Sequence, residues 1–229
     1  MTLVIPEIEI SPELAPILDL GLLAADGVHV TPAGTAVTNA LAAAAAKQRT
    51  AYHAIPFGQI PGIASVRGLF RALGIDPTKT RPSSEALLRR VLKDQGISPV
   101  NNVVDIINLC SLRWLLPMGL YDLAEIGGNL RLGLGGSGTG YAGLGKPWVN
   151  LEGRPALHDD LGPFGAPTSD SFRTRVHEKT TRILLVVFAP RDPEEEAESG
   201  LLTRCLADTR ATLIELCGLA PDAVQVRQQ

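Results

Sequence analysis

A segment near the middle of the chain combines a helical apolar pattern with several amide and carboxyl side chains. Across residues 99–115 the apolar residues recur with the spacing of an amphipathic helix. Asn101, Asp105 and Asn108 fall on one face of that helix, because residues three, four and seven apart share a face. Asn and Asp are poor interior helix residues, and burying them costs free energy unless each is hydrogen-bonded. The segment therefore predicts either a satisfied internal polar network or part of a site.

Helical and strand patterns follow each other irregularly in the rest of the chain. Helices are predicted after Ser11, in an alanine-rich segment ending near Tyr52, at 64–73, after Ser83 or Ser84 as a cap, from an acidic start at 192–199, and along the leucine stripe at 202–216. Strands are predicted at 3–10, 27–30, 129–134, 147–151 and 182–188, the last of them buried and central.

This order of elements contains no repeating strand–helix–strand unit, so the sequence predicts an α+β fold of mixed helices and sheet. At 229 residues the chain suits one large domain or two small lobes. We expect an N-terminal α/β-like lobe at residues 1–63 and a core with a C-terminal helix at residues 64–229.

Charge is distributed unevenly. The net charge of −3 argues against a protein that coats nucleic acid nonspecifically. Residues 67–94 nevertheless hold seven basic and three acidic residues. Two interpretations stay open, a solvated helix surface and a patch that faces phosphates.

Cysteine usage and hydropathy exclude several classes of protein. The three cysteines form no CxxC pair, so neither a zinc site nor a disulfide framework is expected, and Cys205 and Cys217 are predicted to be buried as small hydrophobes. Glu7 and Glu9 interrupt the apolar start, which argues against a signal peptide. No apolar run approaches the roughly 20 residues that span a bilayer. We expect a soluble, cytoplasmic protein with no membrane contact, no cofactor and no metal.

Two motifs that suggest ligands have simpler explanations. Residues 133–145 contain G-x-G-x-x-G and a near P-loop, but no helix pattern follows, and Pro147 stands where a P-loop needs Ser or Thr. A flexible hairpin connection is favoured over a ligand-binding loop. The run His158-Asp159-Asp160 is interpreted as a turn rather than a metal site, because neighbours on a strand point to opposite faces.

A loop before the predicted central strand carries Asp170, Arg173 and Thr174. Sites often form where a loop joins a central strand. Asp170 and Arg173 together would suit a zwitterion such as an amino acid, with Thr174 adding a hydroxyl. A turn that holds only a local Asp–Arg pair explains the same residues, and both interpretations stay open.

Several of these segments resemble one known family. The run NNVVDIINLCSL at 101–112, followed by LLPMGLYDLAEI at 115–126, resembles the tRNA-editing domain of the phenylalanyl-tRNA synthetase beta subunit. The run RPSSEALLRR at 81–90 and the late pattern Asp170, Ser171, Arg173, Thr174 are similar to stand-alone relatives of that domain. The resemblance covers about residues 67–190.

The resemblance implies an editing-type fold and the hydrolysis of a mischarged aminoacyl-tRNA ester, in which a second site sieves the amino acid. For this function we predict a substrate-binding set of Asn101, Asp105, Asn108, Gly119, Tyr121, Asp170, Arg173 and Thr174, and contacts of Arg81, Arg89, Arg90 and Lys93 with the tRNA backbone, although in the family the helix that carries the first three is part of the core. Two positions depart from the family pattern, since Gly119 replaces a His and Arg173 replaces a Glu.

We therefore carry three hypotheses for function. The first is an editing-like domain that binds aminoacyl-tRNA, whether or not it breaks the ester, with the catalytic residue unassigned. The alternative is a non-catalytic binding module for a free amino acid or related metabolite. The third is a purely structural contact within an assembly.

Overall fold

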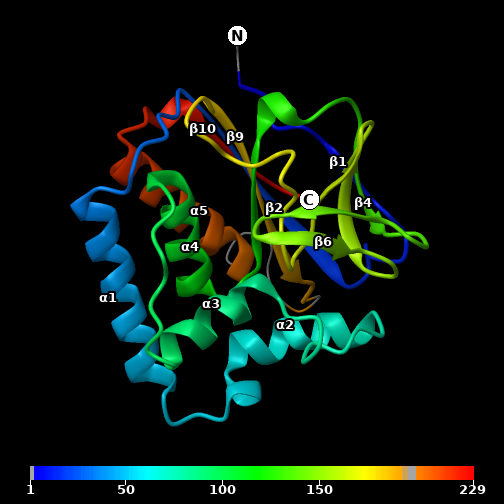
Figure 1. Ribbon diagram of the computed structural model, residues 1–229, viewed down its shortest axis with the longest axis horizontal. Helices are drawn as coiled ribbons and strands as arrows, with labels where there is room; N and C mark the ends of the chain where they lie inside the picture. The colour runs from blue at the N-terminus through cyan, green and yellow to red at the C-terminus, as the bar shows by residue number, and fades with distance from the viewer. Residues whose placement is uncertain (1–2, 193, 195–199) are drawn as a thin grey trace.

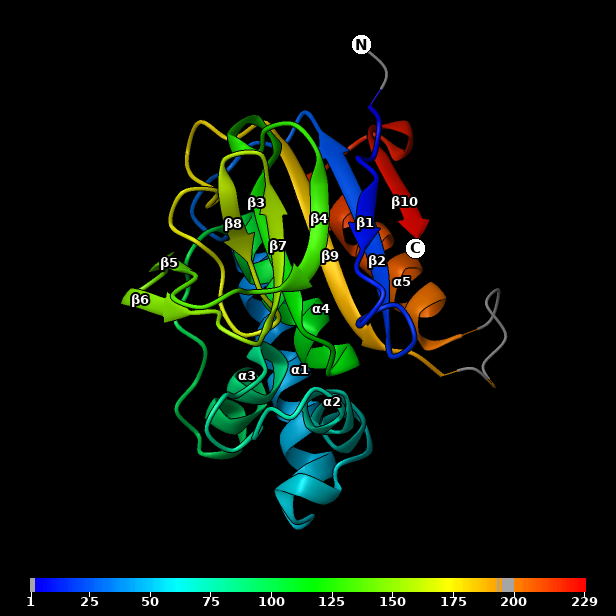
Figure 2. The ribbon, with the colours of Figure 1, turned by 90° about the vertical axis from the view of Figure 1, so that its right-hand side faces the viewer.

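The computed structural model describes residues 3–192, 194 and 200–229, which fold into three layers. Helices cover one face of a central antiparallel sheet, and a second sheet packs against the other face (Figure 1). A two-stranded hairpin projects beside the second sheet (Figure 2). The described residues thus combine helices and strands without a repeating unit, and the predicted α+β class is confirmed.

The central sheet has the strand order β10-β2-β9-β3. Strand β9 (Arg182–Pro190) pairs antiparallel with β2 (Leu18–Asp26) along the full length of both strands, and with β3 (Met118–Asp122) on its other side. Strand β10 (Val224–Gln228) borders β2. The seven residues of β9 from Ile183 to Ala189 are buried, which confirms the prediction of a buried central strand.

The second sheet has the order β1-β4-β7-β8. Strand β1 (Ile8–Ile10) runs parallel to β4 (Leu130–Leu134), which pairs with β7 (Pro155–Asp159), and β7 pairs with β8 (Gly162–Gly165). A buried cluster that includes Leu20, Tyr121 and Phe164 fills the space between the two sheets. The separate hairpin consists of β5 (Gly140–Gly143) and β6 (Lys146–Asn150).

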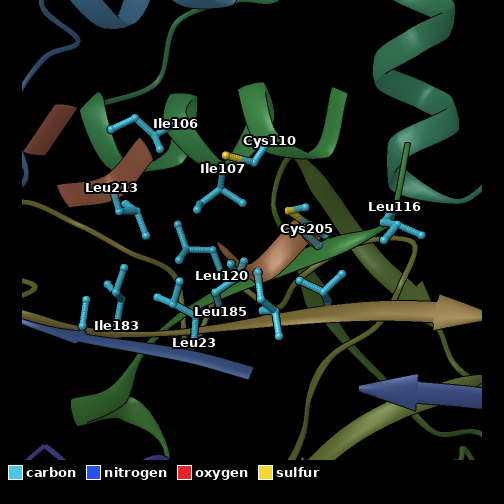
Figure 3. Packing of buried hydrophobic residues seen from close by; sticks show 14 of the residues in the cluster. Leu23, Ile106, Ile107, Cys110, Leu116, Leu120, Ile183, Leu185, Cys205 and Leu213 are labelled. Carbon is cyan, nitrogen blue, oxygen red and sulfur yellow. The ribbon is translucent and has the colours of Figure 1, made fainter. Parts of the chain in front are cut away.

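Five α-helices lie in the described chain: α1 (Thr35–Tyr52), α2 (Pro61–Ala72), α3 (Ser83–Leu92), α4 (Asn102–Trp114) and α5 (Leu201–Cys217). Helices α4 and α5 pack directly on the central sheet (Figure 3). Cys110 of α4 and Cys205 of α5 lie in this core as small apolar residues. Three short 3₁₀ helices complete the described elements, at Phe57–Gln59, Leu123–Glu125 and Pro221–Ala223.

Helix α4 begins and ends at residues with clear roles. The Asn101 side chain is the N-cap and accepts a hydrogen bond from the Val104 N–H at 2.8 Å. Leu115 ends the helix in the left-handed conformation, at φ 57°. This turn directs the chain into β3, which carries Gly119 and Tyr121.

Several sequence predictions are wrong in placement. The strand predicted at residues 27–30 lies instead at 18–26, and residues 12–17 form turns rather than a helix. Strand β2 is buried on both faces, so its apolar run lacks the alternation that marks a half-exposed strand. Helix α3 is capped by Pro82, with no side-chain bond from Ser83 or Ser84. The acidic helix start predicted at 192–199 lies largely outside the described residues.

Two further corrections concern the second sheet. His158 and Asp159 belong to β7 and are buried, whereas only Asp160 lies in the turn that follows. The glycine-rich segment 133–145 contains the end of β4 and all of β5. It therefore includes strand residues and is not only a flexible connection. Strands from residues 1–63 pair with strands from residues 64–229 in both sheets, which joins the two parts of the chain across the proposed boundary.

Candidate functional site

A hydrogen-bonded carboxylate lies between the end of β3 and the loop that follows β8. The Tyr121 hydroxyl donates to Oδ1 of Asp170 at 2.8 Å, and the backbone N–H of Leu120 donates to Oδ2 at 3.2 Å. Tyr121 is fully buried and packs edge-on against Phe164, with ring centroids 5.0 Å apart. The structure therefore brings together Tyr121 and Asp170, two residues of the predicted substrate-binding set whose contact their sequence spacing does not show.

Two glycines make room for the Tyr121 phenol. A Cβ added at Gly119 or at Gly165 would overlap the Tyr121 hydroxyl. An added Cβ at Gly119 would also lie 3.0 Å from Oδ1 of Asp170. The Tyr121 hydroxyl therefore occupies the space that a side chain at position 119 would need. It supplies a polar group there from two residues further along β3.

Burial sets the protonation of this group. Desolvation raises the pKa of Asp170 to about 7, against the opposing effect of the hydrogen bonds from Tyr121 and Leu120. Burial, together with the nearby Asp170 charge, raises the pKa of Tyr121 well above its ordinary value. The pair therefore holds one carboxyl that titrates near neutrality and one phenol that stays protonated.

The β5–β6 hairpin is fixed to the Asp170 loop. The Tyr141 hydroxyl donates to the Ser169 carbonyl at 2.6 Å, the Leu144 N–H to the Asp170 carbonyl at 3.3 Å, and the Phe172 N–H to the Ala142 carbonyl at 2.8 Å. Burial and the charge of Asp170 raise the pKa of Tyr141. The hairpin is therefore a fixed wall beside Asp170.

Arg173 does not pair with Asp170. Its guanidinium forms two hydrogen bonds with the buried carboxylate of Asp159, at 2.9 and 3.0 Å, and another with the Glu125 carbonyl at 2.8 Å. Burial alone would raise the pKa of Asp159, but the Arg173 hydrogen bonds and the Gly127 N–H outweigh it, so this pKa is lowered. The interpretation as a turn with a local Asp170–Arg173 pair is therefore wrong, whereas a zwitterion held by the two residues stays a prediction. Asp159, the carboxylate that Arg173 binds, lies 14 residues earlier in the sequence, and β7 places it beside Arg173. The local sequence around Arg173 therefore does not indicate this pair.

The amide and carboxyl residues of α4 serve mainly to hold that helix. Asp105 is buried and accepts hydrogen bonds from the Val100 N–H, both at 3.2 Å, while burial raises its pKa. Asn108 is half-buried and hydrogen-bonds Asp105, which opposes that rise. The Asn102 side chain donates to the His29 carbonyl and accepts from the Thr31 N–H. Asn101 caps the helix, so the three predicted residues do not form one shared face.

Thr174 belongs to the packing around the site. It is fully buried, and its hydroxyl contacts Ser171 and the Phe164 carbonyl, both at 3.4 Å. Its carbonyl accepts from the Asp122 N–H at 2.9 Å, which ties the loop to β3.

A separate cleft of about 560 Å³ opens near the start of α4. Its charged and polar lining is mixed and includes Asn101, Arg173, Arg175, His177 and Lys179 together with Glu125 and Glu178. The predicted substrate-binding set therefore divides between two places, with Gly119, Tyr121 and Asp170 at one and Asn101 and Arg173 at the other.

The predicted basic patch is partly neutralised within the fold. Glu85 is buried and binds Arg67 through two hydrogen bonds, at 2.7 and 2.8 Å. Arg89 binds Glu85 at 2.9 Å as an ion pair within α3, and Arg81 lies 3.5 Å from the same carboxylate. Arg89 also stacks over the Phe57 ring. Arg90 and Lys93, the other two predicted RNA contacts, are exposed.

The described residues form neither a metal site nor a membrane-spanning helix. Among residues 3–192, 194 and 200–229, no group of three His, Cys, Asp or Glu side chains is arranged to hold a metal ion. None of the described helices is long and apolar enough to cross a membrane.

Comparison with known families places the chain. The B3/4 domain model matches residues 65–193, which is more than half of the chain and includes Tyr121, Asp170 and the hairpin. The chain belongs to the B3/4 domain family. The resemblance in the sequence is thereby confirmed for the segment that carries it.

The related proteins are much longer than this chain. The phenylalanine–tRNA ligase beta subunit of Paramagnetospirillum magneticum is 30% identical over 125 residues, 52% of this chain and 16% of the relative. That of Cereibacter sphaeroides is 29% identical over 144 residues, 62% of this chain and 18% of the relative. An N-terminal fragment of the phenylalanyl-tRNA synthetase beta-subunit from Pyrococcus horikoshii aligns with a TM-score of 0.44 and 12% identity, covering 97% of this chain and 52% of the fragment.

Proposed function

We propose that this B3/4 domain binds aminoacyl-tRNA and hydrolyses the ester of a mischarged amino acid. The beta-subunit relatives and the editing-domain resemblance support the substrate class. The observation that carries the reaction is the Tyr121–Asp170 pair, in which a desolvated carboxyl is oriented by two donors.

In this mechanism Asp170 is the general base. Its ionised carboxylate takes a proton from a water molecule whose oxygen attacks the ester carbonyl carbon. The tetrahedral intermediate then expels the ribose oxygen, which takes the proton back from Asp170. The products are a free amino acid and an uncharged tRNA, and the carboxylate is regenerated.

The surroundings of Asp170 suit this task. A base works best when its pKa lies near the operating pH, and burial raises the pKa of Asp170 to about 7. Each carboxylate oxygen accepts one donor in the structure, which leaves lone pairs for a water. The Tyr121 hydroxyl also takes the place of the polar side chain that the family pattern has at position 119.

The proposed RNA contacts divide by their environment. Arg81 and Arg89 share Glu85, so their charge is partly compensated. Arg90 and Lys93 are exposed near the end of α3, and we propose them as the phosphate contacts of this helix. Asn101 and Arg173 keep a proposed substrate role in the cleft near α4, and the proposal leaves Asp105, Asn108 and Thr174 as the groups that hold the site in place.

Deacylation of a panel of mischarged tRNAs tests the proposal. We expect the wild-type chain to hydrolyse at least one species, and Asp170→Asn to lose activity by about a hundredfold or more. The matched control is Asp160→Asn, which removes an exposed carboxylate ten residues earlier and should leave the rate unchanged. If no species is hydrolysed above the uncatalysed rate, the hydrolase proposal fails. Calorimetric binding of a free amino acid would then favour the binding-module alternative.

A further inference from the structure

The few aromatic residues of this chain are distributed unevenly over its surface. Aromatic residues make up only 4% of the sequence. Among the Trp and Phe side chains, which all lie in the described residues, Trp148 and Phe172 are the two that are more than half exposed, at 56% and 51%. Large apolar side chains that gather on one exposed surface mark interaction sites. Both belong to the unit formed by the β5–β6 hairpin and the Asp170 loop.

The backbone holds these two rings on one unit. The Phe172 N–H donates to the Ala142 carbonyl of β5 at 2.8 Å, and Gly143 of the same strand bridges Ser171. The Trp148 indole lies over Gly140, where an added Cβ would overlap it. The hairpin projects from the edge of the molecule (Figure 2). Both rings are therefore presented from fixed backbone rather than from a free loop.

Apart from Asp170, the charged residues of the hairpin and of the segment that carries Phe172 are basic. Residues 140–150 and 171–175 contain Lys146, Arg173 and Arg175 and no acidic residue, in a chain whose net charge is −3. The Arg175 guanidinium lies 3.7 Å from the centre of the Phe172 ring. In the part of the chain that the structure describes, Lys146 and Arg175 form no ion pair with a carboxylate. Arg175 also lines the cleft near α4, together with Lys179.

From this arrangement we propose that Trp148 and Phe172 form a base-stacking surface for the single-stranded acceptor end of a tRNA, with phosphates bound by Arg175, Lys146 and Lys179. The inference rests on the proposed function, because it names how the RNA is held. Exposed rings interleaved with unpaired basic side chains are the features that bind single-stranded RNA. The complementary charge favours RNA over an apolar protein partner. The surface adjoins Asp170 through the Leu144 and Phe172 backbone bonds, so an end stacked there lies beside the proposed base.

The test uses a fluorescently labelled, unacylated RNA oligonucleotide that ends in single-stranded CCA, with binding measured by anisotropy. Phe172→Leu and Trp148→Leu keep the apolar character but remove the ring, and each should weaken binding about tenfold. Phe172→Tyr and Trp148→Phe keep a ring and should retain most of the affinity. Leu144→Ala removes an exposed, non-aromatic side chain of the same hairpin and is the matched control.

Two outcomes would overturn this inference. One is unchanged affinity in both leucine variants. The other is equal competition by a blunt RNA duplex of the same length, which would show attraction by charge alone. If the first outcome is accompanied by a change in self-association, the rings belong to a protein contact. The oligonucleotide carries no amino acid, so its binding does not depend on ester hydrolysis. Failure of the deacylation assay therefore leaves the binding result unchanged, and failure of RNA binding leaves the deacylation result unchanged.

Discussion

Replacing Tyr121 by Phe should make the stability loss depend on pH. The variant removes one hydroxyl, which donates to Oδ1 of Asp170 at 2.8 Å, and leaves the Leu120 N–H as the remaining donor. A hydrogen bond contributes about 1.5–3 kcal/mol when it meets a charged group and about 0.5–1.5 kcal/mol when both groups are neutral. The variant should therefore cost about 1–2 kcal/mol more where Asp170 is ionised.

The contribution of Asp170 to folding stability changes with pH because its pKa differs between the folded and unfolded states. The pKa of Asp170 is about 7 in the folded chain, above the value of about 3.9 for an unfolded Asp. This carboxyl therefore favours the folded state most below about pH 4, and its contribution is lost as pH rises through about 7. Loss of the Tyr121 donor should raise the folded-state pKa by about one unit further, since 1.36 kcal/mol corresponds to one unit.

Urea unfolding at pH 5 and pH 9 measures the difference. We expect the free energy of unfolding of Tyr121→Phe to fall further below wild type at pH 9 than at pH 5, by about 1–2 kcal/mol. Tyr121 itself does not titrate in this range, because its pKa is raised. The Asp170→Asn background is the control, since the pH dependence should vanish there. Equal losses at both pH values in the wild-type background would refute the assignment of Asp170 as a near-neutral carboxyl.

Three further predictions follow from the contacts. Glu85→Ala should lower the free energy of unfolding by about 3–5 kcal/mol in urea titrations, because it leaves the Arg67 guanidinium buried without its bidentate partner; full retention of stability would contradict that pairing. Cys110 and Cys205 should react with a thiol reagent only after denaturation, because burial raises the pKa of both thiols, to about 11 for Cys110. Gly119→Ala should lower the melting temperature by several degrees in a thermal scan, since its methyl group would overlap the buried phenol.

The sequence predicts well those elements whose signals are local. The alanine-rich helix, the helix that ends before Gly74 and the strand that begins at Arg182 all appear close to their predicted positions. Each has a clear period or an end signal within its own residues. Strand β2 was missed because both of its faces are buried, which removes the alternation that identifies a strand.

The site residues that the sequence indicated are those that the family resemblance covers. Tyr121 and Asp170 are 49 residues apart, and the resemblance, not the spacing, placed them together. The local Asp170–Arg173 pair, one of two open interpretations, is wrong, because Arg173 binds Asp159, which β7 places beside it. Gly165 carried no signal at all, since its role is to leave space for a phenol from another strand.

The position of β2 in the central sheet affects how this chain folds during synthesis. Both neighbours of β2, β9 and β10, follow it by roughly 150 residues or more, so its pairings are among the least local contacts of the fold. At a translation rate of about 5–20 residues per second, the apolar strand waits roughly 8–30 s before β9 has been made. Until then its backbone and apolar side chains have no sheet partner. Nascent chains halted before Arg182 should therefore depend on chaperones, and chains extended beyond β10 should be released from them.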